Sequence, residues 1–354
     1  MTDLLPRTAP APFAARGHLS ELLLATLTAA PDDALDSFAD AVAEATATAL
    51  VTDDVLRDDD VQLSMFLLFA LSYGSVPGLD ASWEWHPSVV SARGLLERAM
   101  EAQLRELVPV PAAPEATRDA VARCLFELTA PSHGPSVSRF VAKKADRAQL
   151  DEFLIIKSIY TLREADPHSW AIPRLTGRAK AALVEIQSDE YGGGDPGRVH
   201  AAIFAQTMRG AGLDDTYAAY VDQVPAIVLA SQNMMSMFGL SHRLRGATVG
   251  HLAAFEMTSS LPNRSYGDGF RRHGFGPDVT WYFDEHVEAD AVHEQIAGRD
   301  LAGSLAEDEP ELLPDILFGA AACLTIDDLV GDHILECWSA GRSALRQPAS
   351  REIG

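Results

Sequence analysis

Three side chains that can bind a metal recur at short intervals near the C-terminal end of the chain. His286, Asp290 and His293 are separated by four and then three residues. In a helix of about 3.6 residues per turn, this spacing places all three side chains on one face, where they can converge on a single ion. Other acidic residues surround them, so the alternative is a solvated polar stripe on a helix surface.

A second pair of candidate ligands flanks a run of three glycines. Glu190 precedes Gly192–Gly194, and His200 follows them. In an unbroken helix the two side chains would lie about 15 Å apart along the axis and about 80° apart around it. The glycines let the chain break or bend, so that both side chains can point at a common centre. The alternative is an ordinary helix end capped by glycine.

Two further carboxylates complete the set of candidates. Glu256 interrupts an otherwise apolar helical run, and a buried ionised carboxylate is costly unless it is paired or bound to a metal. Glu164 lies just before Asp166-Pro167 and is a weaker candidate of the same kind. The alternatives are that Glu256 lies on the rim near its helix end, and that Glu164 is a surface charge beside Arg163.

Together these residues are suited to a pair of iron ions. Diiron carboxylate sites are built from carboxylates and imidazoles on several helices of a bundle. Four carboxylates would balance the four positive charges of two ferrous ions, and three neutral histidines would add nitrogen ligands. No Glu-x-x-His pair occurs in the set, so the layout differs from that of ferritin-like proteins. The candidates are Glu164, Glu190, His200, Glu256, His286, Asp290 and His293.

At these residues the sequence resembles the haem-oxygenase-like diiron oxidases and oxygenases. The order and spacing look like that family's ligand set, and the resemblance covers about residues 130–341. It implies that the seven candidates are ligands of two iron ions per chain, Fe(II) or Fe(III), in a seven-helix bundle that binds no haem. The matching segments are Glu164, Asp189-Glu190-Tyr191-Gly192, His200, Phe255-Glu256, and His286 with Asp290 and His293.

The resemblance also implies a non-haem diiron oxygenase, with O2 as co-substrate and an external electron donor. Family members with a similar N-terminal helical region look like homodimers that act in natural-product biosynthesis, and several are N-oxygenases of amines or guanidines. N-oxygenation of a small amine is therefore the predicted reaction. The alternatives are oxidative C–C cleavage or desaturation of a fatty or amino acid, and a non-catalytic helical binding protein. One N-oxygenase branch carries a C-terminal cupin domain, which this sequence lacks, so the exact reaction stays open.

The elements that must position these residues are helices. Apolar residues recur at three- and four-residue spacing along nearly the whole chain, and no segment alternates with period two for long enough to indicate a sheet. We therefore predict an all-α fold. An N-terminal helical region, residues 1–128, is a candidate for dimerisation, and residues 129–354 form the haem-oxygenase-like diiron domain. Three prolines make residues 109–114 a linker.

Several helix boundaries follow from prolines and glycines. Asp166-Pro167 is expected to end a helix over residues 145–165, and Pro225 to kink one over residues 216–238. Residues 262–276 are polar and rich in glycine, which predicts a loop. Gly331 is expected to break the last helical stretch. The other helices predicted around the candidates span residues 175–191, 196–209, 246–261, 277–297 and 314–341.

Composition narrows the class of partner. The formal net charge of −23 argues against a nucleic-acid backbone, which needs clustered Lys and Arg, and against anionic membrane surfaces. No apolar run is long enough for a transmembrane helix, and the N-terminal residues lack the order of a signal peptide. Cys124, Cys323 and Cys337 show no CxxC spacing, which indicates a reducing compartment. We therefore predict a cytoplasmic enzyme that acts on a small molecule.

Overall fold

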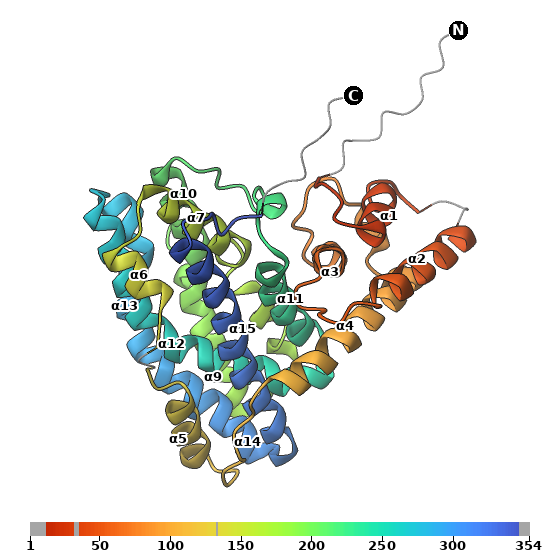
Figure 1. Cartoon of the computed structure of the whole chain (residues 1–354). Coiled ribbons are helices and arrows are strands. Elements are labelled where there is room, and N and C mark those ends of the chain that lie inside the picture. Colours follow the sequence, from red (N-terminus) through yellow and green to blue (C-terminus); the bar gives the residue numbers. More distant parts are fainter. Residues whose placement is uncertain (1–11, 32–34, 132–133, 347–354) are drawn as a thin grey trace. The chain divides into compact units, whose positions relative to one another are not determined.

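The computed structural model describes residues 12–31, 35–131 and 134–346, without the side chains of residues 35–37 and 288–291. Within these residues every regular element is a helix, which confirms the predicted all-α fold (Figure 1). None of the described helices is both long and apolar enough to cross a membrane.

The chain divides into two compact units. The first contains residues 12–106 together with Val221–Met234, and the second contains Leu107–Tyr220 and Met235–Arg346. The predicted boundary after residue 128 differs from this division, because α5 (Arg118–Leu128) buries Val121 and Leu125 in the core of the second unit. The helices of the first unit are α1 (His18–Thr26), α2 (Leu35–Ala49), α3 (Asp59–Tyr73) and α4 (Pro87–Leu107), with the start of α11 (Ala226–Leu240).

The second unit holds all seven candidate ligands, and its long helices pack around one apolar core. The segment between α4 and α5 contains no helix, as the three prolines of residues 109–114 predict. Leu183, Val249, Leu301 and Ile316 belong to the core and come from four different helical segments. These and their neighbours are α6 (Val137–Lys143), α7 (Arg147–Thr161), α8 (Asp166–Ser169), α9 (Gly177–Glu190), α10 (His200–Ala211), α12 (Arg245–Arg272), α13 (Pro277–Gln295), a π-helix (Ile296–Gly303), α14 (Ser304–Asp308) and α15 (Leu313–Ser339).

Two glycines let α12 and α15 pack with their backbones in contact. A Cβ atom on Gly250 would lie 1.8 Å from the carbonyl oxygen of Ile316, and one on Gly319 would lie 2.0 Å from that of Ala247. Both distances are far shorter than any real contact of a Cβ atom. The close crossing therefore exists because neither helix has a side chain at these points, and it anchors the helix that carries Glu256.

The prediction of a loop over residues 262–276 is wrong. α12 continues through Pro262 to Arg272, although a proline inside a helix removes one backbone hydrogen bond. Packing explains the difference, because Phe270 is fully buried and stacks on Phe283 with a centroid distance of 5.2 Å. Gly269 faces the backbone of Val141 so closely that a Cβ atom there would meet the Val141 carbonyl oxygen at 2.6 Å.

Other predicted boundaries also shift. α7 ends at Thr161, earlier than predicted, and Pro167 lies in the first turn of α8 instead of ending a helix. Pro225 precedes α11 rather than kinking a longer helix, because its fixed φ suits a helix start. α15 passes Gly331 without a break. α13 is followed directly by the π-helix, a change that no sequence pattern indicated.

Replacing Gly250 or Gly319 with alanine should destabilise the protein by about 1–3 kcal/mol or more, since the added methyl group forces two backbones apart. Gly94→Ala in α4 is the matched control. Its nearest neighbour would be the Arg98 side chain at 3.4 Å, and alanine favours a helix by up to about 1 kcal/mol over glycine. Urea denaturation measures both, and equal effects of the two kinds of substitution would contradict the close-packing explanation.

Candidate metal centre

Six of the seven candidates have described side chains, and all six are buried. Glu164 lies in the turn between α7 and α8, and Glu256 lies within α12. This burial rules out a rim residue, a surface charge and a solvated stripe for them. Arg163, the neighbour that might have kept Glu164 at the surface, instead pairs with Asp166 at 2.7 Å. Asp290 lies on α13, but its side chain is outside the described part of the structure.

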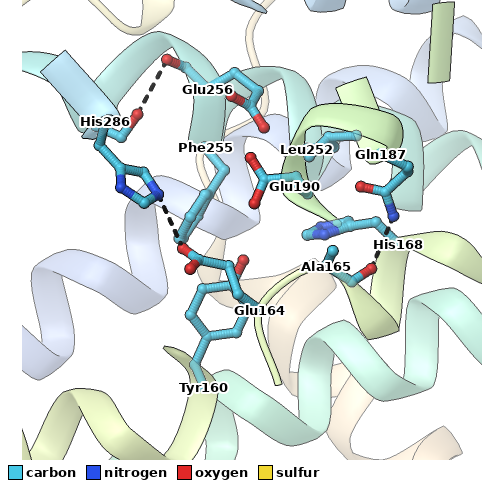
Figure 2. Close-up of a pocket in the computed structure, with 11 residues that line it drawn as sticks. Tyr160, Glu164, Ala165, His168, Gln187, Glu190, Leu252, Phe255, Glu256 and His286 are labelled. Carbon is cyan, nitrogen blue, oxygen red and sulfur yellow. Dashed lines mark hydrogen bonds and ion pairs between the residues drawn. The ribbon is translucent and has the colours of Figure 1, made fainter. Parts of the chain in front are cut away.

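The first group of candidates combines two carboxylates and two imidazoles. Candidate ligand atoms of Glu164, Glu190, His200 and His286 all lie within 4.8 Å of one another. His200 Nδ1 is 2.9 Å from Glu190 Oε2, and His286 Nε2 is 3.5 Å from Glu164 Oε1. Figure 2 shows Glu164, Glu190 and His286 turned towards the same space. Mixed oxygen and nitrogen ligands at such distances suit a divalent transition metal.

The second group shares one member with the first. Atoms of Glu190, Glu256 and His293 also lie within 4.8 Å of one another, and His293 Nδ1 is 3.3 Å from Glu256 Oε2. Glu190 therefore belongs to both groups. The backbone of Asp290 lies one helical turn before His293 on α13.

The glycine run produces the bend that the sequence indicated. Glu190 is the last residue of α9, and His200 is the first residue of α10. Gly192 has a φ of +74°, and a Cβ atom on it would lie 2.7 Å from the backbone of Arg198 and Val199. The chain can fold back tightly here only because this residue has no side chain, and the fold-back brings Glu190 and His200 together.

Two of the histidines are oriented by their second ring nitrogen. His286 Nδ1 lies 2.7 Å from the backbone carbonyl oxygen of Tyr282, which can only accept a hydrogen bond. His293 Nε2 lies 3.1 Å from Asp189 Oδ2. In both cases the outer nitrogen donates its hydrogen, so the other nitrogen faces the carboxylates, as in the histidine ligands of metal sites. The Asp189 side chain is 62 % exposed, so it orients His293 from the surface of the protein.

Glu164 is positioned by a buried phenol. The hydroxyl group of Tyr282 donates to Glu164 Oε1 at 2.7 Å, and it does so from the same helix as His286, one turn earlier. Sequence reasoning missed Tyr282, although the four-residue spacing to His286 places both on one face of α13. The same helix face therefore carries the candidate ligand His286 and the residue that orients the candidate ligand Glu164.

Without a cation, this concentration of charge is compensated by protons. Burial lowers the pKa of His293, but the carboxylates of Glu256 and Asp189 outweigh it and raise the pKa to about 9. Burial raises the pKa of Glu256, and the nearby charge of Glu190 adds to the effect. Metal binding would replace such protons, since imidazole binds a metal in its neutral form.

Several buried polar atoms around the centre lack a hydrogen bond of normal geometry within the described residues. Such atoms are costly in an interior, and cations bound in the two ligand groups would satisfy them. The donor set of buried carboxylates and imidazoles thus fits the iron ions that the sequence predicts. The atoms are Glu164 Oε2, Glu190 Oε2, His200 Nδ1 and His293 Nδ1.

A small cavity adjoins the carboxylates. It has room for about one water-sized molecule between its walls. Its lining residues other than the candidate ligands are mainly Tyr160, His168, Gln187, Leu252, Phe255 and Ser259.

Two histidines outside the candidate set form a buried pair. His168 Nε2 lies 3.0 Å from His251 Nδ1. Burial lowers the pKa of His168 to about 4 and that of His251 well below its usual value, so both are neutral. Neither residue belongs to the two ligand groups.

A family model described as iron-containing redox enzyme matches residues 151–328, half of the chain. The match begins in α7, ends in α15 and contains all seven candidate ligands. No curated protein matches the chain.

Gly192→Ala should weaken both stability and iron binding, because alanine strains a left-handed residue by about 1–2 kcal/mol and also collides with the backbone of Arg198. Gly193→Ala is the matched control, since its φ is +59° but a Cβ atom would meet nothing within 4 Å. Unfolding free energies and iron retained after Fe(II) loading and gel filtration measure the difference. Equal losses in the two variants would show that the tight fold-back does not matter.

Proposed function

Since the chain belongs to the iron-containing redox enzymes and is an iron-dependent oxidoreductase, we propose that it is a non-haem diiron oxygenase that N-oxygenates a small amine. The observation that carries the proposal is the pair of buried ligand groups that share Glu190. When bound, iron would supply the redox chemistry towards O2. Four carboxylates, with Asp290 as the fourth, would balance the charge of two ferrous ions.

Different residues of the chain would hold each of the two ions. Glu164, His200 and His286 would hold one ion, and Glu256, Asp290 and His293 the other, with Glu190 between them. The Tyr282 hydroxyl group and backbone carbonyl hold Glu164 and His286, and the Asp189 carboxylate holds His293. Ligands fixed in this way need little rearrangement when the charge at the centre changes.

The surroundings of the centre exclude bulk water. Tyr160 and Phe255 pack edge to face at 5.1 Å beside the carboxylates, and Leu252 adds a further apolar wall. The cavity is narrow, and the apolar side chains beside the carboxylates help to protect reactive species from water. It also limits how much of a substrate can approach, so a small terminal group such as an amine fits it better than a bulky one.

An amine substrate is supported by the resemblance to N-oxygenases and by the acidity of the chain. None of the cavity-lining residues in the described structure is Lys or Arg, the side chains that would attract a carboxylate substrate. Oxidative C–C cleavage and desaturation give products different from N-oxygenation, so product analysis separates the three reactions. The external electron donor, the homodimer, the natural-product pathway and the cytoplasmic location stay predictions from the sequence.

Glu190→Gln should lower the affinity for both iron ions, whereas Glu256→Gln should lower it for only one, because only Glu190 belongs to both ligand groups. After anaerobic Fe(II) loading we expect about two irons per chain in the parent protein, about one in the Glu256 variant and less than one in the Glu190 variant. Glu185→Gln, an exposed substitution on the same helix, is the control and should retain the parent's iron.

The oxygenase itself is tested by O2 uptake of the Fe(II)-loaded protein with a panel of primary amines, followed by mass spectrometry of the products. Uptake that depends on an amine and yields an N-oxygenated product supports the proposal. An alkene or a shortened chain would instead support desaturation or cleavage. A parent protein that takes up no Fe(II), or that shows a Soret band after incubation with haem, would favour a non-catalytic binding protein.

A further inference from the structure

Gln187 is a polar residue of the cavity wall that the metal centre does not use. It lies on α9 three residues before Glu190, so both side chains point from the same helix face towards the cavity. The residue is only 3 % exposed. Figure 2 shows its amide beside Glu190 and His168.

The orientation of the Gln187 amide is fixed by its nitrogen. Nε2 donates one hydrogen bond to the carbonyl oxygen of Ala165 at 2.8 Å and another to Ser169 Oγ at 2.7 Å. A backbone carbonyl can only accept, so the nitrogen must face Ala165 and the amide cannot be turned over. Both hydrogens of the amide group are therefore used, and Oε1 faces the other way.

A chain of hydrogen bonds holds this arrangement from behind. Ser169 Oγ lies 2.9 Å from the hydroxyl group of Tyr191, which donates to Asp166 Oδ1 at 2.8 Å. Asp166 is in turn paired with Arg163. Tyr191 gives its hydrogen to the carboxylate of Asp166, and the single hydrogen of Ser169 Oγ has two acceptors within reach, the Tyr191 hydroxyl group and the Ala165 carbonyl oxygen at 3.2 Å.

Gln187 Oε1 itself has no hydrogen-bond partner among the described residues. Leaving a buried acceptor unsatisfied costs about 1–3 kcal/mol, so the position is suited to a ligand that brings a donor. His168, its neighbour in the wall, is uncharged, and its Nε2 is already engaged with His251. This part of the cavity wall, next to Glu190, therefore offers an oriented acceptor and no cation.

We propose that Gln187 is a specificity-determining residue, whose Oε1 accepts an N–H hydrogen from the amino group of the substrate. This inference rests on the proposed function and adds how the substrate is oriented, namely with its amino group innermost. A terminal amino group is about the size of the one water-sized molecule for which the cavity has room. A carboxylate in the same place would meet an acceptor with no hydrogen to share.

The test compares binding of two ligands of equal charge, n-butylammonium and N,N,N-trimethylbutylammonium, to the anaerobic Fe(II)-loaded protein by calorimetry. Only the first carries N–H donors. In Gln187→Met we expect the preference for n-butylammonium to fall about tenfold or more relative to the parent. The size difference between the two ligands is the same in both proteins, so the change in preference reports the hydrogen bond.

Ser169→Ala is the matched control, because it removes one hydrogen bond behind the amide but leaves Oε1 and the Ala165 contact in place. It should keep the parent's preference. If both variants lose the preference equally, or if Gln187→Met keeps it, Gln187 is only a structural anchor and the assignment is overturned. Where an amine is turned over, the Gln187 variant should also raise KM for primary amines more than it lowers kcat.

The parent protein alone provides a second measurement that does not depend on the folding of a variant. Equal affinity for the two ligands, or no binding of n-butylammonium, overturns the assignment. Failure of the proposed function is recognised separately, because it appears as absent iron or absent amine-dependent O2 uptake in the parent. If the parent protein binds iron and takes up O2 with an amine, but the iron-loaded Gln187 variant keeps the parent's ligand preference, only the role of Gln187 is rejected and the proposed function stands.

Discussion

The structure depends on the burial of several carboxylates and imidazoles around one centre. Each buried charge is unfavourable by itself, and the group is stable only if protons or cations lie between its members. The carboxylate of Glu190 occupies the middle, within reach of His200 on one side and of the Glu256 and His293 group on the other. This constraint explains why neighbouring residues fix the orientation of the buried groups. Tyr282 holds Glu164 and Asp189 holds His293 by hydrogen bonds, so that neither side chain turns away from the centre.

Helix ends make such a centre compatible with an all-α fold. Glu190 and His200 occupy two facing helix termini joined by the glycine turn, and Glu164 lies in a turn between helices. Residues at helix ends can approach from directions that helix faces alone do not offer. Among the candidate ligands of the described structure, those on α12 and α13 are the ones that lie within a helix, and α12 is held against α15 by backbone contact at Gly250.

Much of this arrangement could be predicted, for identifiable reasons. The spacing of His286 and His293 predicts that they share a helix face, and the glycines between Glu190 and His200 predict a bend. Both features could be predicted because they depend on local backbone geometry. The course of α12 beyond Pro262 could not be predicted, since it rests on the packing of Phe270 and Gly269 against distant segments. For the same reason α5 belongs with the second unit, although the predicted boundary after residue 128 placed it with the N-terminal region.

The residues that sequence reasoning missed share a pattern. Tyr282 and Gln187 each lie one helical turn before a candidate ligand, on the same face of its helix. A helix that presents a ligand to a buried centre necessarily presents the residues one turn away to the same space, so these positions either support the ligands or face whatever enters the cavity. Tyr282 does the first, through its hydrogen bond to Glu164. Gln187 has its nitrogen committed to the backbone and its oxygen left towards the cavity, which is the arrangement expected of a residue that meets a ligand.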